Sequence, residues 1–265
     1  MPCKIKTIVC AGARMDCAVI GDGPKPVLMI PGMSLHKVTP QSEAVAGAYK
    51  SFASDYTIYL LDRREKPDRG LSVSDMADDA AAALEQLGIA AAFVLGPSQG
   101  GMIAMELALR HPERVRGLAL VSTIARQSET SRDTMRRWKE LSALESPVEL
   151  NRDVFRSVYS PEYFHRYEKA FSRLESIGTP EEMRSFGIMA SATATFDIYD
   201  RIGGISCPVL VAGVQKDTVL GSEGTADIAG ALHCRSIVYP GSGHAFYDET
   251  PSFPEIIKDF FDGED

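Results

Sequence analysis

Short apolar runs that alternate with helical patterns limit the folds open to this chain more than any other feature. The runs predicted as buried strands lie at residues 27–30, 57–61, 93–95, 117–121, 209–212 and 236–239. Helical patterns are found at residues 74–87, 100–110, 222–231 and 254–261. Residues 4–10 and 14–20, joined around Gly12, are predicted as a leading antiparallel hairpin. Apolar strands separated by helices predict an α/β fold, with a mostly parallel, twisted sheet covered by helices on both faces.

The alternation stops between residues 124 and 201, where no run has the character of a strand. Pro147, Pro161 and Pro180 break this segment into short helices. We therefore expect a core made of residues 1–123 and 202–265, with a helical cap inserted at residues 124–201. The segment holds nearly half of the aromatic residues of the chain. Packing within the cap explains most of them, and Tyr163 and Phe164 are candidates to line a substrate pocket.

Composition narrows the classes of partner. The formal net charge of −8 leaves no broad basic surface for nucleic acid. No apolar run reaches the roughly 18 residues that a membrane span requires, and the first residues lack the apolar stretch of a secretory signal. The five cysteines are scattered without C-x-x-C spacing, as is typical of reduced thiols in the cytoplasm. We expect a cytoplasmic protein that binds a small molecule, and its oligomeric state stays open.

A candidate nucleophile follows the strand predicted at residues 93–95. Residues 96–101 read GPSQGG and match the pattern G-x-S-x-G, with Ser98 at its centre and a predicted helix directly after it. A serine on a tight turn between strand and helix projects its hydroxyl above the edge of the sheet. The residues two positions before and after it must be small, because the chain nearly touches itself there. The new helix also directs backbone N–H groups toward the reacting centre.

Residues 95–104 resemble the nucleophile elbow of the α/β-hydrolase superfamily, and residues 109–121 are similar to the helix and strand that follow it there. The resemblance covers roughly residues 27–121 and 208–261, and the cap is unmatched. It implies the α/β-hydrolase fold and a serine nucleophile. The serine argues against the epoxide hydrolases and haloalkane dehalogenases of this fold, which use an aspartate. It does not fix the substrate, because one scaffold hosts many reactions.

A serine hydroxyl needs a base to accept its proton. His244 lies in a glycine-rich loop directly after the last predicted strand, and it is the last histidine of the chain, as the Ser–Asp–His order of this fold requires. Asp217 is the acidic residue of the loop after residues 209–212, where it would orient the imidazole. Asp62, which follows a more distant strand, is the alternative acid. Among the other histidines, His36 could border the site, and His111, His165 and His233 are expected elsewhere.

Two segments depart from the pattern of the superfamily. The loop that usually reads His-Gly reads Pro31-Gly32 here, and the resemblance implies that the backbone N–H groups of Met33 and Gln99 form the oxyanion hole. Residues 62–70 read DRREKPDRG, where the superfamily often has D-x-R-G-x-G-x-S. Such a charged loop is usually solvated. The alternative is that Arg63 or Arg64 pairs with a carboxylate of the substrate.

These observations predict a hydrolase that acts through a Ser-His-Asp triad and an acyl-serine intermediate on a small carboxylic ester, thioester or lactone. The alternatives are hydrolysis of a carbon–carbon bond, a lyase or synthase reaction on the same triad, and a small-molecule receptor that has kept the scaffold without catalysis. The sequence contains neither a cluster of metal ligands nor a phosphate-binding loop. We therefore expect neither a metal nor an organic cofactor.

Overall fold

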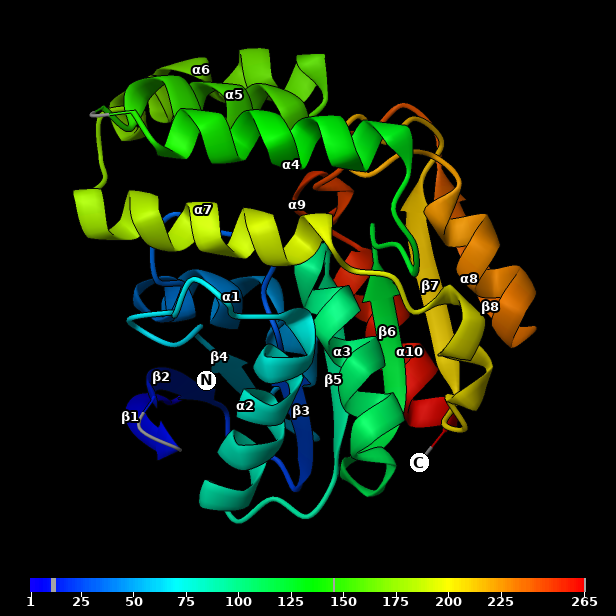
Figure 1. Ribbon diagram of the computed structural model, residues 1–265. Helices are drawn as coiled ribbons and strands as arrows, with labels where there is room; N and C mark the ends of the chain where they lie inside the picture. Colours follow the sequence, from blue (N-terminus) through cyan, green and yellow to red (C-terminus); the bar gives the residue numbers. More distant parts are fainter. Residues whose placement is uncertain (11–12, 145, 265) are drawn as a thin grey trace.

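An eight-stranded sheet runs through the centre of the molecule in the computed structural model, which describes residues 1–10, 13–144 and 146–264 (Figure 1). Its strand order is β1-β2-β4-β3-β5-β6-β7-β8. The strands are β1 (Cys3–Cys10), β2 (Ala13–Ile20), β3 (Lys25–Met29), β4 (Tyr56–Leu61), β5 (Ala92–Pro97), β6 (Val115–Val121), β7 (Val209–Val214) and β8 (Arg235–Tyr239). The β1–β2 and β2–β4 pairs are antiparallel, and the other neighbours are parallel. The turn expected around Gly12 lies outside the described residues.

Consecutive residues of the inner strands point to opposite faces of the sheet and enter different cores. Leu28 and Val94 belong to the core that packs against α2 (Val73–Gln86), α3 (Gln99–Arg110) and α8 (Gly224–Leu232). Their neighbours, such as Val27 and Phe93, belong to the core that contains the apolar face of α10 (Phe253–Gly263). Burial on both faces explains why these strands are continuously apolar in sequence. The predicted α/β fold is confirmed.

The predicted elements of the core agree with the observed ones to within a few residues at each end. The helix expected at 74–87 is α2, which starts at a capping box made by Ser72 and Asp75. It ends before Gly88, whose φ of +73° suits a residue without a side chain. Two short helices, α1 (Ser42–Ala48) and α9 (Phe246–Glu249), were not predicted. Each is too short to show a clear apolar period.

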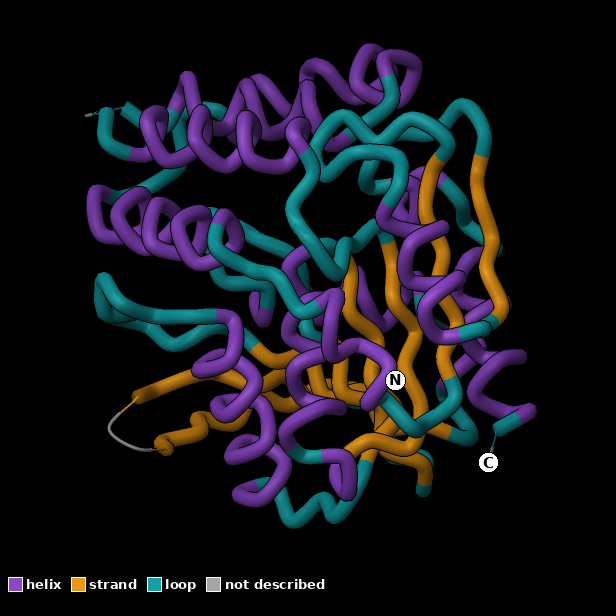
Figure 2. Tube along the Cα trace, turned by 45° about the vertical axis from the view of Figure 1, so that its right-hand side comes forward, coloured by secondary structure: helices purple, strands orange, loops and turns teal. Residues whose placement is uncertain are grey.

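Between β6 and β7 the described residues form four α-helices: α4 (Glu129–Ser142), α5 (Val148–Val158), α6 (Pro161–Leu174) and α7 (Pro180–Ala194). Figure 1 shows them stacked over the carboxyl ends of the strands, with α7 nearest the sheet, and Figure 2 shows the same arrangement from another side. Pro147 is the N-cap of α5, and Pro161 and Pro180 open the next two helices, so each predicted break stands at a helix start. None of the described helices combines the length and apolar character that a bilayer span requires.

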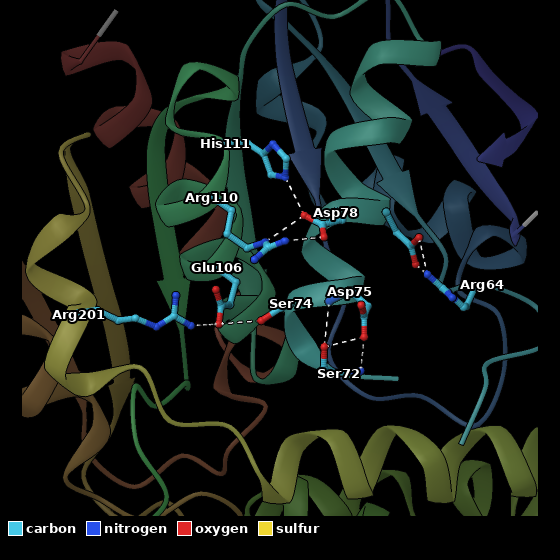
Figure 3. A network of polar contacts seen from close by, with 10 residues as sticks. Arg64, Ser72, Ser74, Asp75, Asp78, Glu106, Arg110, His111 and Arg201 are labelled. Carbon is cyan, nitrogen blue, oxygen red and sulfur yellow. Dashed lines mark hydrogen bonds and ion pairs between the residues drawn. The ribbon is translucent and has the colours of Figure 1, made fainter. Parts of the chain in front are cut away.

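A network of polar contacts joins the segment that follows α7 to the core helices α2 and α3 (Figure 3). The side chain of Glu106 on α3 is 3% exposed. Its carboxylate binds Arg201, which lies in the 3-10 helix η4 (Tyr199–Gly204) after the four helices. The hydroxyl of Ser74 on α2 donates to the same carboxylate over 3.1 Å. On the outer part of α2, Asp78 accepts two hydrogen bonds from Arg110. The helix that begins at the elbow is therefore held from both sides.

Candidate active site

Ser98 lies at the turn between β5 and α3 in a strained backbone conformation, with φ +54° and ψ −125°. Residues other than glycine rarely have a positive φ, and such strain collects at functional sites. The glycines around it are required by space. A Cβ on Gly96 would lie 2.5 Å from the carbonyl oxygen of Gly100, and a Cβ on Gly100 would overlap the carbonyl oxygen of Ile30. Gly96 and Gly100 therefore have no room for a side chain, as the sequence pattern predicts.

The end of β6 holds the backbone of Ser98 through two hydrogen bonds. Its N–H donates to the carbonyl of Val121 over 2.8 Å, and its carbonyl accepts a 2.8 Å hydrogen bond from Thr123 Oγ1. On the other side, a Cβ built on Gly32 would lie 3.9 Å from Ser98 Oγ, so the loop after β3 passes directly beside the hydroxyl. This loop therefore stands close enough to contribute N–H groups to the same site.

His244 and Asp217 form a buried pair. The Nδ1 atom of His244 lies 2.7 Å from Asp217 Oδ2, and the two side chains are 3% and 6% exposed. The second carboxylate oxygen, Oδ1, accepts hydrogen bonds from the backbone N–H groups of Val219 and Leu220, each over 2.8 Å. A carboxylate on Nδ1 favours the imidazole tautomer that leaves Nε2 without a proton, ready to act as a base.

The environment of Asp217 favours its charged form. Burial alone raises the pKa of this carboxyl group, but the charge and hydrogen bond of His244 act in the opposite direction. Together with the two backbone N–H donors they outweigh burial, so the pKa of Asp217 lies below its usual range. Asp217 therefore stays ionised beside the imidazole at neutral pH.

Two contacts fix the loop that carries His244. The hydroxyl of Ser122, directly after β6, donates to the His244 carbonyl over 2.7 Å. The carboxylate of Glu249 accepts hydrogen bonds from the N–H groups of Gly243 and Ser160, over 3.3 and 2.7 Å. Ser160 begins α6, so this carboxylate joins the histidine loop to the helices above the sheet. His244 is therefore held on both sides, although its loop is rich in glycine.

Met33 and Gln99 carry the two backbone N–H groups that the sequence predicts as oxyanion donors. Gln99 is the first residue of α3, and Met33 follows Gly32 in the loop beside Ser98. Across the parts of the chain that the structure describes, neither backbone N–H donates a hydrogen bond to another group. Unpaired backbone donors beside a nucleophile are suited to bind an oxyanion.

The remaining candidates lie elsewhere. Asp62 uses its carboxylate to accept hydrogen bonds from the Val38 N–H and the Thr39 hydroxyl, each over 2.6 Å, so it is not the partner of His244. His111 lies 2.8 Å from Asp78 on the outer surface, His233 caps α8, and His165 is exposed on α6. His36 lies beside α7, with its Nδ1 3.0 Å from Glu182, and it lines the cavity that opens next to Gly32.

A cavity of about 620 Å³ opens next to Gly32, between residues 31–41, residues 62–67 and the first half of α7. Arg63 and Arg64 both line it. Two donors of Arg64 bind the carboxylate of Asp79, over 2.8 and 2.7 Å. Arg63 donates to uncharged oxygens, the nearer being the Pro31 carbonyl at 2.5 Å, and burial lowers its pKa to about 10.

Within the described residues no cluster of acidic, His or Cys side chains could hold a metal ion.

Tyr163 and Phe164 are not among the residues that line this cavity. Both belong to α6, where Tyr163 stacks on Tyr159 and Phe164 stacks on Phe171, with ring centroids 5.0 and 5.5 Å apart. Their contacts are thus those of aromatic packing within the four helices. Their role in a substrate pocket stays a prediction.

A sequence profile described as "alpha/beta hydrolase fold" matches residues 25–251. The chain belongs to the α/β-hydrolase family. It is 29% identical to a protein of Azorhizobium caulinodans named as a candidate carbamate hydrolase, RutD, over 83% of this chain and 84% of that one. It is 28% identical to a homoserine O-acetyltransferase of Thermus thermophilus, over 72% of this chain and 58% of the transferase. In structure it resembles MGS-M2, an α/β hydrolase enzyme from a Medee basin deep-sea metagenome library, with TM-score 0.86, 18% identity and 97% of each chain covered.

Sequence reasoning missed several residues of this hydrolase that hold the site together. Ser122 and Thr123 follow the strand predicted at residues 117–121, at the same edge of the sheet as Ser98. Neither residue is a carboxylate, but two adjacent hydroxyls at a strand end are themselves a signal of such a role. Thr193 of α7, which binds the side chain of Gln99, carried no such signal. Its partner is 94 residues away, and no local pattern indicates the contact.

Proposed function

We propose that this hydrolase cleaves a small carboxylic ester, thioester or lactone through an acyl-serine intermediate, with Ser98, His244 and Asp217 as the catalytic triad. The observation that carries the proposal is the strained Ser98 at a strand–helix turn, together with the buried His244–Asp217 pair. Ser122 and Thr123, adjacent in the chain, tie the backbones of His244 and Ser98 to the end of the same strand. Nucleophile and base are therefore fixed to one rigid element.

In the first half of the reaction, Ser98 Oγ attacks the carbonyl carbon of the substrate while its proton passes to His244 Nε2. The carbonyl oxygen becomes an oxyanion, which the N–H groups of Met33 and Gln99 bind. Each such donor is worth about 3 kcal/mol in a preorganised site. Asp217 stabilises the imidazolium that has formed. The tetrahedral intermediate then collapses, the bond to the leaving group breaks, and His244 returns its proton to the leaving oxygen or sulfur.

In the second half, water attacks the acyl-serine. His244 accepts a proton from the water, and the same two N–H groups bind the second oxyanion. Collapse of this intermediate breaks the bond to Ser98 Oγ, which regains its proton from His244. The carboxylic acid leaves, and the enzyme is restored without a net change in its own protonation.

The four helices α4–α7 act as a cap in this proposal, with residues 124–201 as the cap segment. The cavity beside Gly32, lined by Arg64 and the first half of α7, is the place for the part of the substrate that distinguishes one ester from another. Because Asp79 holds two donors of Arg64, this side chain is fixed. Its other terminal nitrogen has no hydrogen-bond partner among the described residues and can bind an anionic group.

The proposal is tested with a panel of p-nitrophenyl esters, thioesters and lactones. We expect turnover of at least one class, and we expect Ser98→Ala to abolish it. Ser236→Ala, a change at an exposed serine of β8, serves as the matched control and should keep the wild-type rate. Binding of these compounds without turnover would contradict an enzymatic role. Turnover that survives Ser98→Ala would remove the acyl-serine.

A further inference from the structure

The side chain of Gln99 links the elbow to the cap helix α7. Gln99 directly follows Ser98 and is 1% exposed. Its amide nitrogen has two hydrogens and both are used. Nε2 lies 2.7 Å from Thr193 Oγ1 and 3.1 Å from the carbonyl oxygen of Met189, both on α7. The residue that supplies one proposed oxyanion donor is therefore bound to the cap by two buried hydrogen bonds.

The hydroxyl of Thr193 also reaches the other proposed donor residue. Thr193 Oγ1 lies 3.5 Å from Met33 Sδ and 3.0 Å from the Met189 carbonyl, and Thr193 is 1% exposed. Thr193 Oγ1 accepts a hydrogen bond from Gln99 Nε2. Its own hydrogen is shared between the Met33 sulfur and the Met189 carbonyl oxygen. A single cap hydroxyl therefore contacts the side chains of both residues whose N–H groups are the proposed oxyanion donors.

Arg63 joins the same two segments from the core side. Its Nη2 lies 2.5 Å from the Pro31 carbonyl oxygen and 3.5 Å from Gln99 Oε1. Pro31 begins the loop that carries Met33, and this loop has no helix or strand hydrogen bonds of its own. The position of Met33 therefore depends on contacts with its neighbours. Met33 packs against the core and contacts Thr193 through its sulfur, while Arg63 holds the start of its loop at Pro31.

We propose that Thr193 is a positioning residue that sets the geometry of the oxyanion hole, with the side chain of Gln99 as its relay. This inference rests on the proposed function. An oxyanion donor is effective only when it lies about 2.7–3.1 Å from the place where the charge develops. Thr193 acts before the reaction, by holding Met33 and Gln99 at a fixed separation. The cap helix is thereby a part of the catalytic apparatus as well as a wall of the pocket.

The test compares Thr193→Val, which removes the hydroxyl and keeps the shape, with Thr193→Ser, which restores the hydroxyl. Thr195→Val is the matched control, because this exposed threonine is the C-cap of the same helix and its hydroxyl donates to the Ala192 carbonyl of that helix. The kcat and KM of a p-nitrophenyl ester are measured, with inhibition by a boronic acid that forms a tetrahedral adduct on serine. For Thr193→Val we expect kcat and boronate affinity to fall about tenfold, because loss of a whole donor costs about 100- to 1,000-fold. We expect KM to change less than about twofold.

Thr193→Ser should recover most of the lost kcat, and Thr195→Val should match the wild type. Gln99→Leu keeps its backbone N–H and removes the two hydrogen bonds to α7, together with the longer contact of Arg63 with Gln99 Oε1. It should show the same selective loss of kcat, and the double variant with Thr193→Val should lose little more. This variant also tests the inference if Thr193→Val folds poorly.

A fall in melting temperature with unchanged kcat in an active enzyme would overturn this inference and leave the proposed function in place. A rise in KM at constant kcat would do the same, since it would make Thr193 a residue of the substrate pocket. Absence of any turnover that depends on Ser98 in the wild type would overturn both proposals.

Discussion

Ser122 Oγ donates a 2.7 Å hydrogen bond to the backbone carbonyl of His244, 122 residues further along the chain. Ser122 is 2% exposed and has a positive φ of 43°, which turns its side chain toward the histidine loop. The next residue, Thr123, binds the carbonyl of Ser98 in the same way. The end of β6 thus carries two adjacent hydroxyls that fix the backbones of the proposed base and nucleophile.

Ser122→Ala should therefore lower kcat, because the His244 loop loses an anchor. A buried hydrogen bond is worth about 1 kcal/mol net, which corresponds to roughly fivefold in rate if the loss falls on the reactive geometry. Steady-state kinetics on a p-nitrophenyl ester measure the effect. Ser191→Ala is the control, because the Ser191 hydroxyl donates to the Gly187 carbonyl within its own helix. Equal rates in both variants would show that the Ser122 contact has no part in positioning the base.

His244→Ala should slow the labelling of Ser98 by a fluorophosphonate at least about 100-fold, because the serine hydroxyl loses the acceptor of its proton. Labelling rates are followed by mass spectrometry of the intact protein. His111→Ala is the control, since His111 pairs with Asp78 on the outer surface and should leave the labelling rate unchanged. If His244→Ala is labelled as fast as the wild type, another group is the base.

The stability of the protein should depend on Asp217 in acid. Its pKa in the folded state lies below its usual value, near 3.9 in the unfolded chain. The stabilisation is thus fully present above about pH 4 and is lost as the pH falls through the lower, folded pKa. Denaturant unfolding between pH 6 and pH 2.5 should show the wild type losing more stability than Asp217→Asn. Parallel loss in both proteins would mean that the pKa of Asp217 is not depressed.

Arg64→Ala should reduce turnover of acidic esters more than turnover of neutral ones. A hydrogen bond to a charged group is worth about 1.5–3 kcal/mol, so the ratio of kcat/KM for a mono-p-nitrophenyl succinate and a p-nitrophenyl butyrate should fall by roughly tenfold or more. Arg110→Ala breaks a similar pair, with Asp78, outside the cavity and should leave this ratio unchanged. A constant ratio in Arg64→Ala would limit Arg64 to its structural pair with Asp79.

The sequence predicted the strands and helices of the core because their signals are local. Apolar runs mark the buried strands, and Gly96, Gly100 and the positions of Ser98 and His244 after strands locate the site. The contacts of α7 could not be predicted in this way. The Gln99–Thr193 hydrogen bond joins residues 94 positions apart, and it depends on how the helix packs. Tyr163 and Phe164 show the same limit, since aromatic composition does not tell a pocket wall from packing between helices.

Mass spectrometry of the protein quenched during turnover of a p-nitrophenyl ester detects an acyl-serine intermediate itself. We expect an added mass equal to one acyl group, located on the peptide that contains Ser98. The adduct should be absent in Ser98→Ala, which should also have lost turnover. An acyl group on a different residue, or undiminished turnover by Ser98→Ala, would contradict an acyl-serine mechanism at this site.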